Sequence, residues 1–310
     1  MAGPLITVVG ETVLDYVPTR GGGFAGRVGG SPANVARGLA RLGRSVLLQT
    51  AIGDDEAGQL LTTCLGDDGV RVDPASLRPG HSSTARAHLD GAGRASYELD
   101  IHWDPGALPV PAGTTWWHTG SLATVMAPGA AQVETALRAC RTTEVPTSID
   151  FNVRDPLPWP ADRTLRHLLG LARDACVVKA SEDDVALLAP GQDPRVVARG
   201  WLGHGRTVLV VVTLGDRGAW AATELDEIEV GTPAVQLVDT VGAGDSFMAA
   251  LIDALLPPTG QDPKTWRQVL DDPRALAHGV HRANVAAAIC CEREGADPPT
   301  RATLGARLRA

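Results

Sequence analysis

Lysine is nearly absent from this chain, since only Lys179 and Lys264 occur among its 28 basic residues. Neither lysine lies in a glycine loop, and no G-x-x-x-x-G-K-[ST] run occurs, which excludes a P-loop kinase. The arginine bias is explained better by the base composition of the coding sequence than by anion binding. No basic run is present, and a net charge of −8 argues against a nucleic-acid surface.

Cysteine is scarce and odd in number, and its spacing does not match a metal site; the five are Cys64, Cys140, Cys176, Cys290 and Cys291. A reduced, cytoplasmic protein is the simplest interpretation. The first apolar run, Leu5 to Val9, is far too short to span a membrane, and no basic segment precedes it. We therefore expect a cytoplasmic, soluble chain without a membrane partner.

Alternating apolar segments and helical patterns dominate the 310 residues, 44% of which are hydrophobic and 21% charged. We expect strands at 5–9, 46–52, 115–118, 148–152, 176–179 and 208–213, a helix capped by Ser31 with Pro32 in its first position, and another at 56–65. Strands separated by helices predict a mostly parallel α/β sheet. Ligands bind beyond the carboxyl ends of such strands, where we expect Asp15, Asp150, Asn152 and Thr213.

A hairpin signature interrupts this alternation: residues 84–89 and 94–99 flank Asp90-Gly91-Ala92-Gly93. It predicts a small accessory sheet. A G-x-G-x-x-G match at Gly21, Gly23 and Gly26 neither follows a strand nor precedes a helix, so we interpret it as a flexible loop. His278 and His281 have no third ligand nearby in sequence and are not expected to bind metal.

The most informative segment is Val238-Asp-Thr-Val-Gly-Ala-Gly-Asp-Ser-Phe247, which enters an apolar helical pattern. Gly242, Ala243 and Gly244 allow close backbone approach, and a helix N-terminus binds phosphate through free N–H groups. An acid beside an anion site repels the anion, so Asp245 makes chemical sense as a base for an attacking hydroxyl. The alternative is a glycine-rich turn with Asp245 as an ordinary helix cap.

This segment resembles the C-terminal signature of the ribokinase-like (PfkB) carbohydrate kinases. The segment from Gly29-Gly30 through Asn34 to Gly43, about 200 residues earlier, resembles their N-terminal signature and is closest to the fructokinase branch. The resemblance implies a single kinase domain over 1–310, a three-layer sandwich around a mostly parallel sheet, and a small β lid near 11–28 and 84–103. It also implies ATP-dependent phosphorylation of a primary sugar hydroxyl, with fructose as the expected sugar.

The same resemblance implies roles for particular residues. Asp245 is the base, and the backbone at Gly242, Ala243 and Gly244 forms the anion hole. The expected sugar ligands are Asp15, Gly29, Gly30, Asn34 and Arg154, where Arg154 has an ion pair with Asp150 or Asp155 as its alternative. The expected nucleotide ligands are Lys179, Ser181, Thr213, Gly215, Gly218 and Asn284. Asp184, where the family has a longer acid, is expected to contact Mg²⁺ through water. Asp239, Val241 and Gly295 are expected to bind a monovalent cation such as K⁺.

Three other functions stay open. A 2-keto-3-deoxygluconate kinase shares these signatures, but the Tyr-Arg pair of that branch is missing after Tyr97, where Asp100 and Ile101 stand. A nucleoside kinase is favoured if Trp103 or Tyr97 stacks on a base. A non-catalytic sugar or nucleotide sensor would lack the base, yet Asp245 is present. A homodimer through the β lid is a further expectation.

Overall fold

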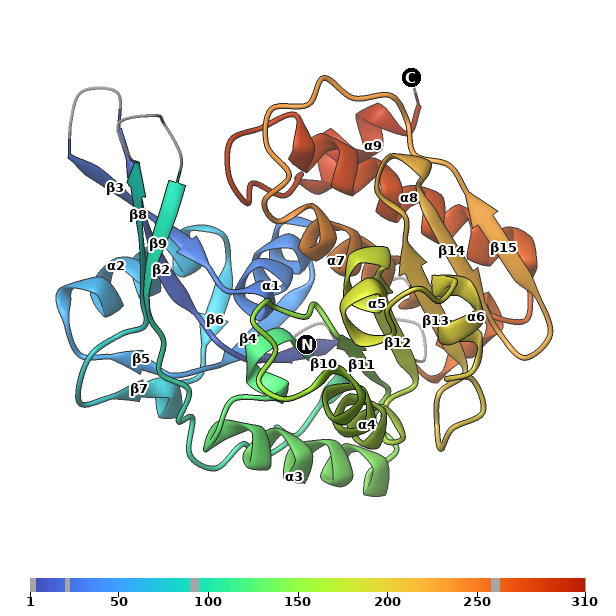
Figure 1. Ribbon diagram of the computed structural model, residues 1–310, viewed down its shortest axis with the longest axis horizontal. Coiled ribbons are helices and arrows are strands. Elements are labelled where there is room, and N and C mark those ends of the chain that lie inside the picture. Colours follow the sequence, from blue (N-terminus) through green and yellow to red (C-terminus); the bar gives the residue numbers. More distant parts are fainter. Residues whose placement is uncertain (1–3, 20–22, 90–94, 258–262, 310) are drawn as a thin grey trace.

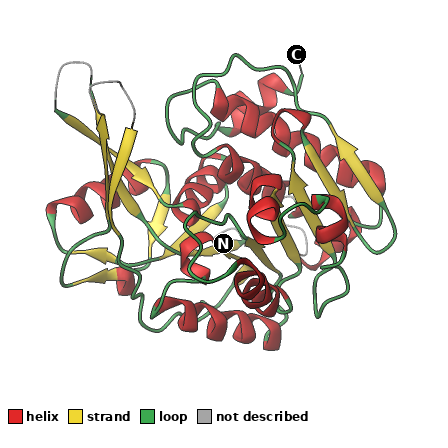
Figure 2. Ribbon diagram, in the orientation of Figure 1, coloured by secondary structure: helices red, strands yellow, loops and turns green. Residues whose placement is uncertain are grey.

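The chain folds around a twisted nine-stranded sheet with helices on both faces (Figures 1 and 2). The structure is a computed structural model that describes residues 4–19, 23–89, 95–257 and 263–309. In spatial order the strands are β15 (Glu227–Val230), β14 (Ala219–Ala222), β13 (Leu209–Thr213), β12 (Val177–Ser181), β11 (Thr147–Asp150), β10 (Thr114–Gly120), β1 (Leu5–Val9), β4 (Ser45–Gln49) and β6 (Val70–Val72). All pairs from β6 to β13 are parallel, and β14 and β15 add antiparallel.

Each face of this sheet carries its own hydrophobic core. Alternate strand residues such as Trp116 and Val177 join the core under one helical layer: α1 (Ser31–Arg41), α2 (Glu56–Asp67), α7 (Ala243–Leu255), α8 (Pro273–Cys291) and α9 (Arg301–Arg307). Trp117 and Val178 join the opposite core, under α3 (Gly129–Thr142), α4 (Ala161–Ala172), α5 (Glu182–Leu188) and α6 (Pro194–Arg199). Burial on both faces explains the continuous apolar runs of these strands. The three-layer sandwich is confirmed.

A second sheet stands upright beside the main one, at the left of Figure 1. We call it the small sheet; its strand order is β3 (Phe24–Gly29), β2 (Val13–Pro18), β8 (Thr84–Leu89) and β9 (Ala95–Asp100). The antiparallel pair of β8 and β9 confirms the predicted hairpin, whose turn lies outside the described residues. A two-stranded pairing of β5 (Ile52–Gly53) with β7 (Leu77–Arg78) lies near it.

Four local predictions were wrong. Residues 24–26 are not a flexible loop but begin β3, where Gly26 fits because a Cβ there would lie 2.7 Å from Leu60 Cδ2. The predicted strand 46–52 is broken, since Thr50 N–H donates to Ser76 Oγ at 2.8 Å instead of to a neighbouring strand. Asp15 lies within β2 of the small sheet, not directly beyond the end of a strand of the main sheet. Ser31 is inside α1, whose cap is Gly30 with φ 89°.

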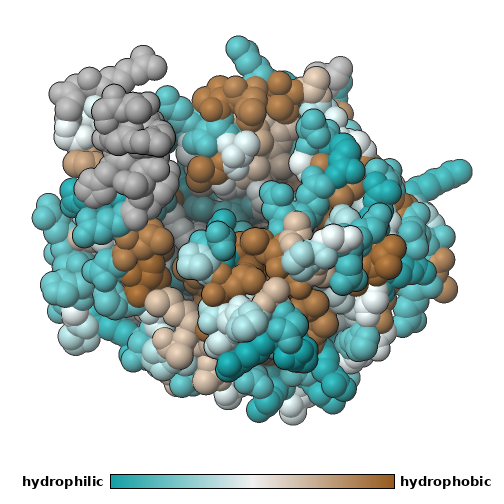
Figure 3. Space-filling model, viewed as in Figure 1, coloured by the Kyte–Doolittle hydropathy of each residue, from teal (hydrophilic) through white to brown (hydrophobic). Residues whose placement is uncertain are grey.

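No helix in the described part of the chain is long and apolar enough to cross a membrane. The space-filling view shows a hollow between the small sheet and the helical body (Figure 3).

Candidate active site

The N-terminus of α7 forms a sharp glycine turn, which we call the anion turn (Gly242–Asp245). Gly242 caps the helix in the left-handed region with φ 75°, and a Cβ there would lie 2.5 Å from Ala296 Cβ. Ala243 N–H donates to Thr240 O at 3.2 Å, whereas the amides of Gly242, Gly244 and Asp245 have no acceptor in the part of the chain that is described. Three free amides at a helix N-terminus suit an anion.

Asp245 is held in a fixed orientation beside those amides. Its carboxylate is buried and accepts hydrogen bonds from Ser31 Oγ at 2.7 Å and Asn34 Nδ2 at 2.9 Å, both from α1. Asn152 Nδ2 donates a longer one at 3.4 Å. Because Gly242 is the cap and Asp245 is the third helical residue, the interpretation of Asp245 as a helix cap is wrong. The sequence did not single out Ser31, whose pattern beside Pro32 indicated only a cap.

A buried ion pair lies under the anion turn. Lys179 Nζ donates to Asp150 Oδ2 at 2.7 Å, and both side chains are almost fully buried. The same Nζ would lie 3.5 Å from a Cβ on Gly244. Burial raises the pKa of Asp150 to about 6, against the opposing effect of Lys179. The arrangement therefore holds an ammonium group beside the first turn of α7.

Ser181 and Asp184 are engaged in structural bonds at the start of α5. Ser181 Oγ accepts from Asp184 N–H at 3.0 Å, and the Asp184 carboxylate accepts from Ser181 N–H and Val153 N–H, both at 2.6 Å. This capping box fixes the segment after β11 to α5. Among the described residues no group of three or more His, Cys, Asp or Glu side chains could hold a metal ion. The water-mediated Mg²⁺ contact of Asp184 stays a prediction.

The expected sugar ligands come together where β2, β3 and α1 meet. A Cβ on Gly29 would lie 2.2 Å from Asp15 Oδ2, and one on Gly30 would lie 2.5 Å from Glu11 O. Asn34 N–H donates to Gly30 O at 3.0 Å, which joins this group to the side chain that holds Asp245. Burial raises the pKa of Asp15 to about 6. Asp15 accepts no side-chain hydrogen bond from any described residue, so its oxygens are free for ligand hydroxyls.

Arg154 is exposed and forms no ion pair with a described residue, so the alternative pairing with Asp150 or Asp155 is wrong. It lines a cavity of about 140 Å³ together with Asn152, Ser121 and apolar side chains. Glu11, a residue absent from the predicted ligands, is buried behind this region and accepts from Ala123 N–H at 3.0 Å. Burial raises the pKa of Glu11 to about 7. Its place directly after β1 was the available signal.

His118 was also missed. It is fully buried on β10, and its Nδ1 bonds to Ser148 Oγ at 2.9 Å. Ser148 Oγ also accepts from Trp116 Nε1 at 2.9 Å, so this hydroxyl links two buried ring side chains of β10. Burial, followed by the Lys179 charge, lowers the pKa of His118 to about 3. The ring is therefore neutral, and its burial gave no signal in the sequence.

The six expected nucleotide ligands lie in two places: Lys179 and Ser181 are on β12, and the other four are on β13, in the turn after it and on α8. Thr213 ends β13, and Gly215 and Gly218 follow with φ values of 60° and 94°. Gly218 approaches Val230 O, which would lie 2.1 Å from a Cβ, and Asn284 Nδ2 donates to the same oxygen at 2.8 Å. Asn284 is thus bonded to the end of β15. The structure brings Gly218 and Asn284 together around Val230.

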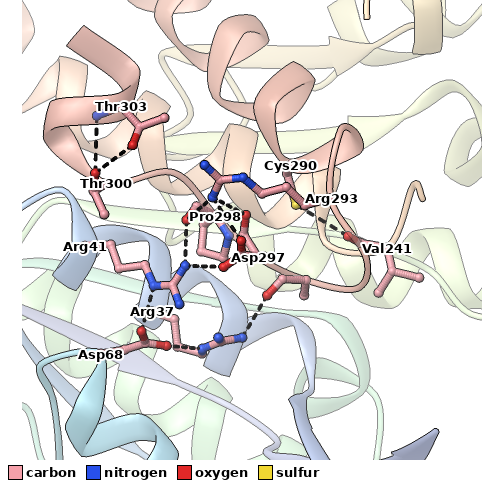
Figure 4. A network of polar contacts seen from close by, with 11 residues as sticks. Arg37, Arg41, Asp68, Val241, Cys290, Arg293, Asp297, Pro298, Thr300 and Thr303 are labelled. Carbon is pink, nitrogen blue, oxygen red and sulfur yellow. Dashed lines mark hydrogen bonds and ion pairs between the residues drawn. The ribbon is translucent and has the colours of Figure 1, made fainter. Parts of the chain in front are cut away.

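The three residues expected to bind a cation lie together. Asp239 accepts from Val241 N–H at 3.1 Å and from Gly295 N–H at 2.8 Å. Cys290 Sγ donates to Val241 O at 3.5 Å (Figure 4). A carboxylate and a carbonyl next to the anion turn offer the oxygen ligands that a hard cation prefers.

Trp103 does not have the stacking role considered for it, and Asp100 does not share a face of the small sheet with Asp15. Trp103 is buried in the core against α3, where its Nε1 donates to Ala123 O at 3.1 Å, so it cannot stack on a base. The Tyr97 side chain lies outside the described residues. Asp100 pairs with His102 at 2.9 Å, and the strand register places it in the row of Leu14 rather than of Asp15. It therefore lies on the other face of the small sheet from Asp15.

A family profile for "pfkB family carbohydrate kinase" matches residues 4–303 of the chain. A probable fructokinase-6 of Arabidopsis thaliana, described as chloroplastic, is 30% identical over 316 residues, which cover 95% of this chain and 79% of the relative.

Two solved structures share the fold. A fructokinase from Xylella fastidiosa with bound ATP superposes with a TM-score of 0.84 at 23% identity, over 99% of this chain and 98% of the other. A fructokinase double mutant from Vibrio cholerae O395, with fructose, ADP and potassium ion bound, has a TM-score of 0.81 at 26% identity, over 99% of each chain.

Proposed function

Because the chain belongs to the pfkB family of carbohydrate kinases, we propose that it transfers the γ-phosphoryl group of ATP to a primary hydroxyl of fructose. The observation that carries this proposal is the buried Asp245 carboxylate, fixed by Ser31 and Asn34 beside three free amides of the anion turn. The fructokinases among its relatives and structural neighbours support fructose as the acceptor.

In this mechanism, the sugar hydroxyl attacks the γ-phosphorus while Asp245 takes the hydroxyl proton. A new P–O bond forms to the sugar, the bond to the β-phosphate oxygen breaks, and ADP leaves. The free amides of Gly242, Gly244 and Asp245 bind the negative charge that develops on the phosphoryl oxygens. Lys179, held by Asp150 beside Gly244, adds a positive charge at the same place.

We propose Asp15, Gly29, Gly30 and Asn34 as sugar ligands, and Thr213, Gly215, Gly218 and Asn284 as nucleotide ligands. Mg²⁺ bound to the phosphates would neutralise part of their negative charge, and it would contact Asp184 through a water molecule. The Asp239 carboxylate and the Val241 carbonyl fit a monovalent cation, and the potassium-bound relative supports K⁺. Arg154 is available to bind an anionic group of the substrate, because it forms no ion pair with a described residue.

The small sheet would form a lid over this site, within a single kinase domain of residues 1–310. We also propose, from the resemblance, that two copies associate through the small sheet and that the protein works in the cytoplasm. Light scattering at several protein concentrations tests the association.

We expect fructose to be a better substrate than 2-keto-3-deoxygluconate or a nucleoside. The site already contains the Asp15 and Asp245 carboxylates, so a sugar acid adds a third negative charge, whereas Trp103 is not available to a base. An ADP-release assay over fructose, ribose, 2-keto-3-deoxygluconate and inosine should give the highest kcat/KM for fructose, by at least about tenfold over the sugar acid. A higher value for the acid would contradict the choice of substrate. No turnover with any acceptor would contradict the kinase and favour a sensor.

Sugar binding should weaken in acid. Since burial raises the pKa of Asp15 to about 6, the carboxylate is charged at pH 8 and mostly protonated at pH 5. The charged form accepts hydroxyl hydrogen bonds more strongly, so the sugar KM should rise as the pH falls through about 6. Steady-state kinetics from pH 5 to 8 would measure it, and Asp15→Asn should remove the dependence. An equal dependence in that variant would assign the titration to another group.

A further inference from the structure

An arginine of the small sheet reaches across to Glu294 and Gly295, beside the residue that packs on the anion turn. Arg27 on β3 stands directly opposite Asp15 on β2, so both side chains lie on the same face of the small sheet. Despite this pairing, Arg27 does not bind Asp15. Its Nη2 donates to Glu294 Oε2 at 3.1 Å, and its Nη1 would lie 2.7 Å from a Cβ on Gly295.

The segment that receives Arg27 is firmly anchored. We call residues 292–298 the C-terminal turn. Figure 4 shows its contacts with α1: Arg37 Nη1 donates to Ala296 O at 2.9 Å, and Arg41 Nη1 donates to Pro298 O at 2.8 Å. Both arginines also bind Asp68, and Arg41 contacts Asp297. The turn is therefore a fixed surface against which Arg27 is placed.

This surface adjoins the proposed phosphate site. Ala296 is the residue that packs on Gly242, the cap of α7, and Gly295 is bonded to Asp239 at the start of the same signature. The Arg27 guanidinium therefore lies at Gly295, and the next residue, Ala296, contacts Gly242 of the anion turn. Arg27 comes from the face of the small sheet that also carries Asp15. Among the described residues, Glu294 is its only ionic partner.

We propose that Arg27 is a further phosphate-binding residue, which leaves Glu294 and binds the phosphates of ATP when the nucleotide occupies the site. The proposal rests on the kinase function given above. The Arg27 and Glu294 side chains are 39% and 71% exposed, and an ion pair this exposed contributes little, so it is readily exchanged. A guanidinium can bind a phosphate group through two parallel N–H bonds, whereas Arg27 donates one hydrogen bond to Glu294. Phosphate is therefore a stronger partner for Arg27 than the Glu294 carboxylate.

The test compares Arg27→Gln with Glu294→Gln. Loss of a charged hydrogen-bonding partner of the phosphates should lower kcat/KM for ATP by about 10- to 150-fold in Arg27→Gln and weaken ATP binding in calorimetry. The KM for fructose should change much less. Glu294→Gln should keep full turnover with an equal or lower KM for ATP, because Arg27 is then released from its competitor.

Arg195→Gln is the matched control, since Arg195 bonds Glu229 at 3.0 Å in a similarly exposed pair on β15 and α6. Equal losses of kcat/KM for ATP in Arg27→Gln and Glu294→Gln would show that the ion pair only holds the small sheet against the C-terminal turn. That result would overturn the proposal. So would unchanged ATP kinetics in Arg27→Gln. Fructose turnover by the unaltered protein in the same assay keeps the test separate from the proposed function, and circular dichroism establishes that each variant is folded.

Discussion

Asp245→Asn should abolish most turnover while the protein stays folded and still binds ATP. General-base catalysis contributes about 10²- to 10⁴-fold, and the amide cannot take the hydroxyl proton, so kcat should fall by at least that range. The isosteric amide keeps an oxygen that can accept from Ser31 or Asn34. ATP affinity should fall little, because the free amides of the anion turn are backbone groups that the substitution leaves in place.

Turnover should be measured by ADP release with fructose, and ATP affinity by calorimetry. Asp271→Asn provides a control that removes an equal charge from an exposed position and should behave like the unaltered protein. Near-normal kcat in a folded Asp245→Asn preparation would exclude Asp245 as the base. A loss of ATP binding as large as the loss of turnover would instead assign Asp245 to the geometry of the anion turn.

The sequence predicted those parts of the fold that depend on local patterns. The strands β1, β10, β11, β12 and β13 and the hairpin of β8 with β9 are confirmed to within a few residues. Their apolar runs and turn signals are short-range features. The motif around Gly242 likewise predicted the helix that begins there.

Features that depend on distant residues could not be found in this way. Ser31 looks like a helix cap, and its role is decided by Asp245, 214 residues away. Gly26 marks a flexible segment by itself, but in β3 it lies against Leu60 and Leu14, whose side chains would come within 2.7 Å and 3.2 Å of a Cβ there. The ion pair of Lys179 with Asp150 and the neutral His118 depend on burial, which sequence spacing does not measure.

Asp15→Ala should raise the KM for the sugar far more than the KM for ATP. Asp15 carries a half-buried carboxylate without a side-chain partner in the described chain, against Gly29 and on the face of the small sheet that Arg27 shares. A hydrogen bond to a charged acceptor contributes about 1.5–3 kcal/mol, so loss of the carboxylate should raise the sugar KM by roughly 10- to 150-fold.

The free energy of unfolding distinguishes a loss of sugar binding in Asp15→Ala from misfolding of the variant. The folded pKa of Asp15 lies near 6, above its ordinary value of 3.8, so the folded state binds the proton more tightly than the unfolded state between these pH values. The Asp15 carboxylate therefore makes the protein less stable as the pH rises through about 6, and removing it should raise the relative stability at pH 8 compared with pH 4. Urea unfolding of Asp15→Ala and Asp15→Asn at both pH values measures this difference. A variant that is more stable at pH 8 than the unaltered protein, yet has a high sugar KM, would show that the Asp15 carboxylate contributes to sugar binding and not to the stability of the fold. If ATP affinity falls as much as sugar affinity, Asp15 belongs to the nucleotide side of the cleft.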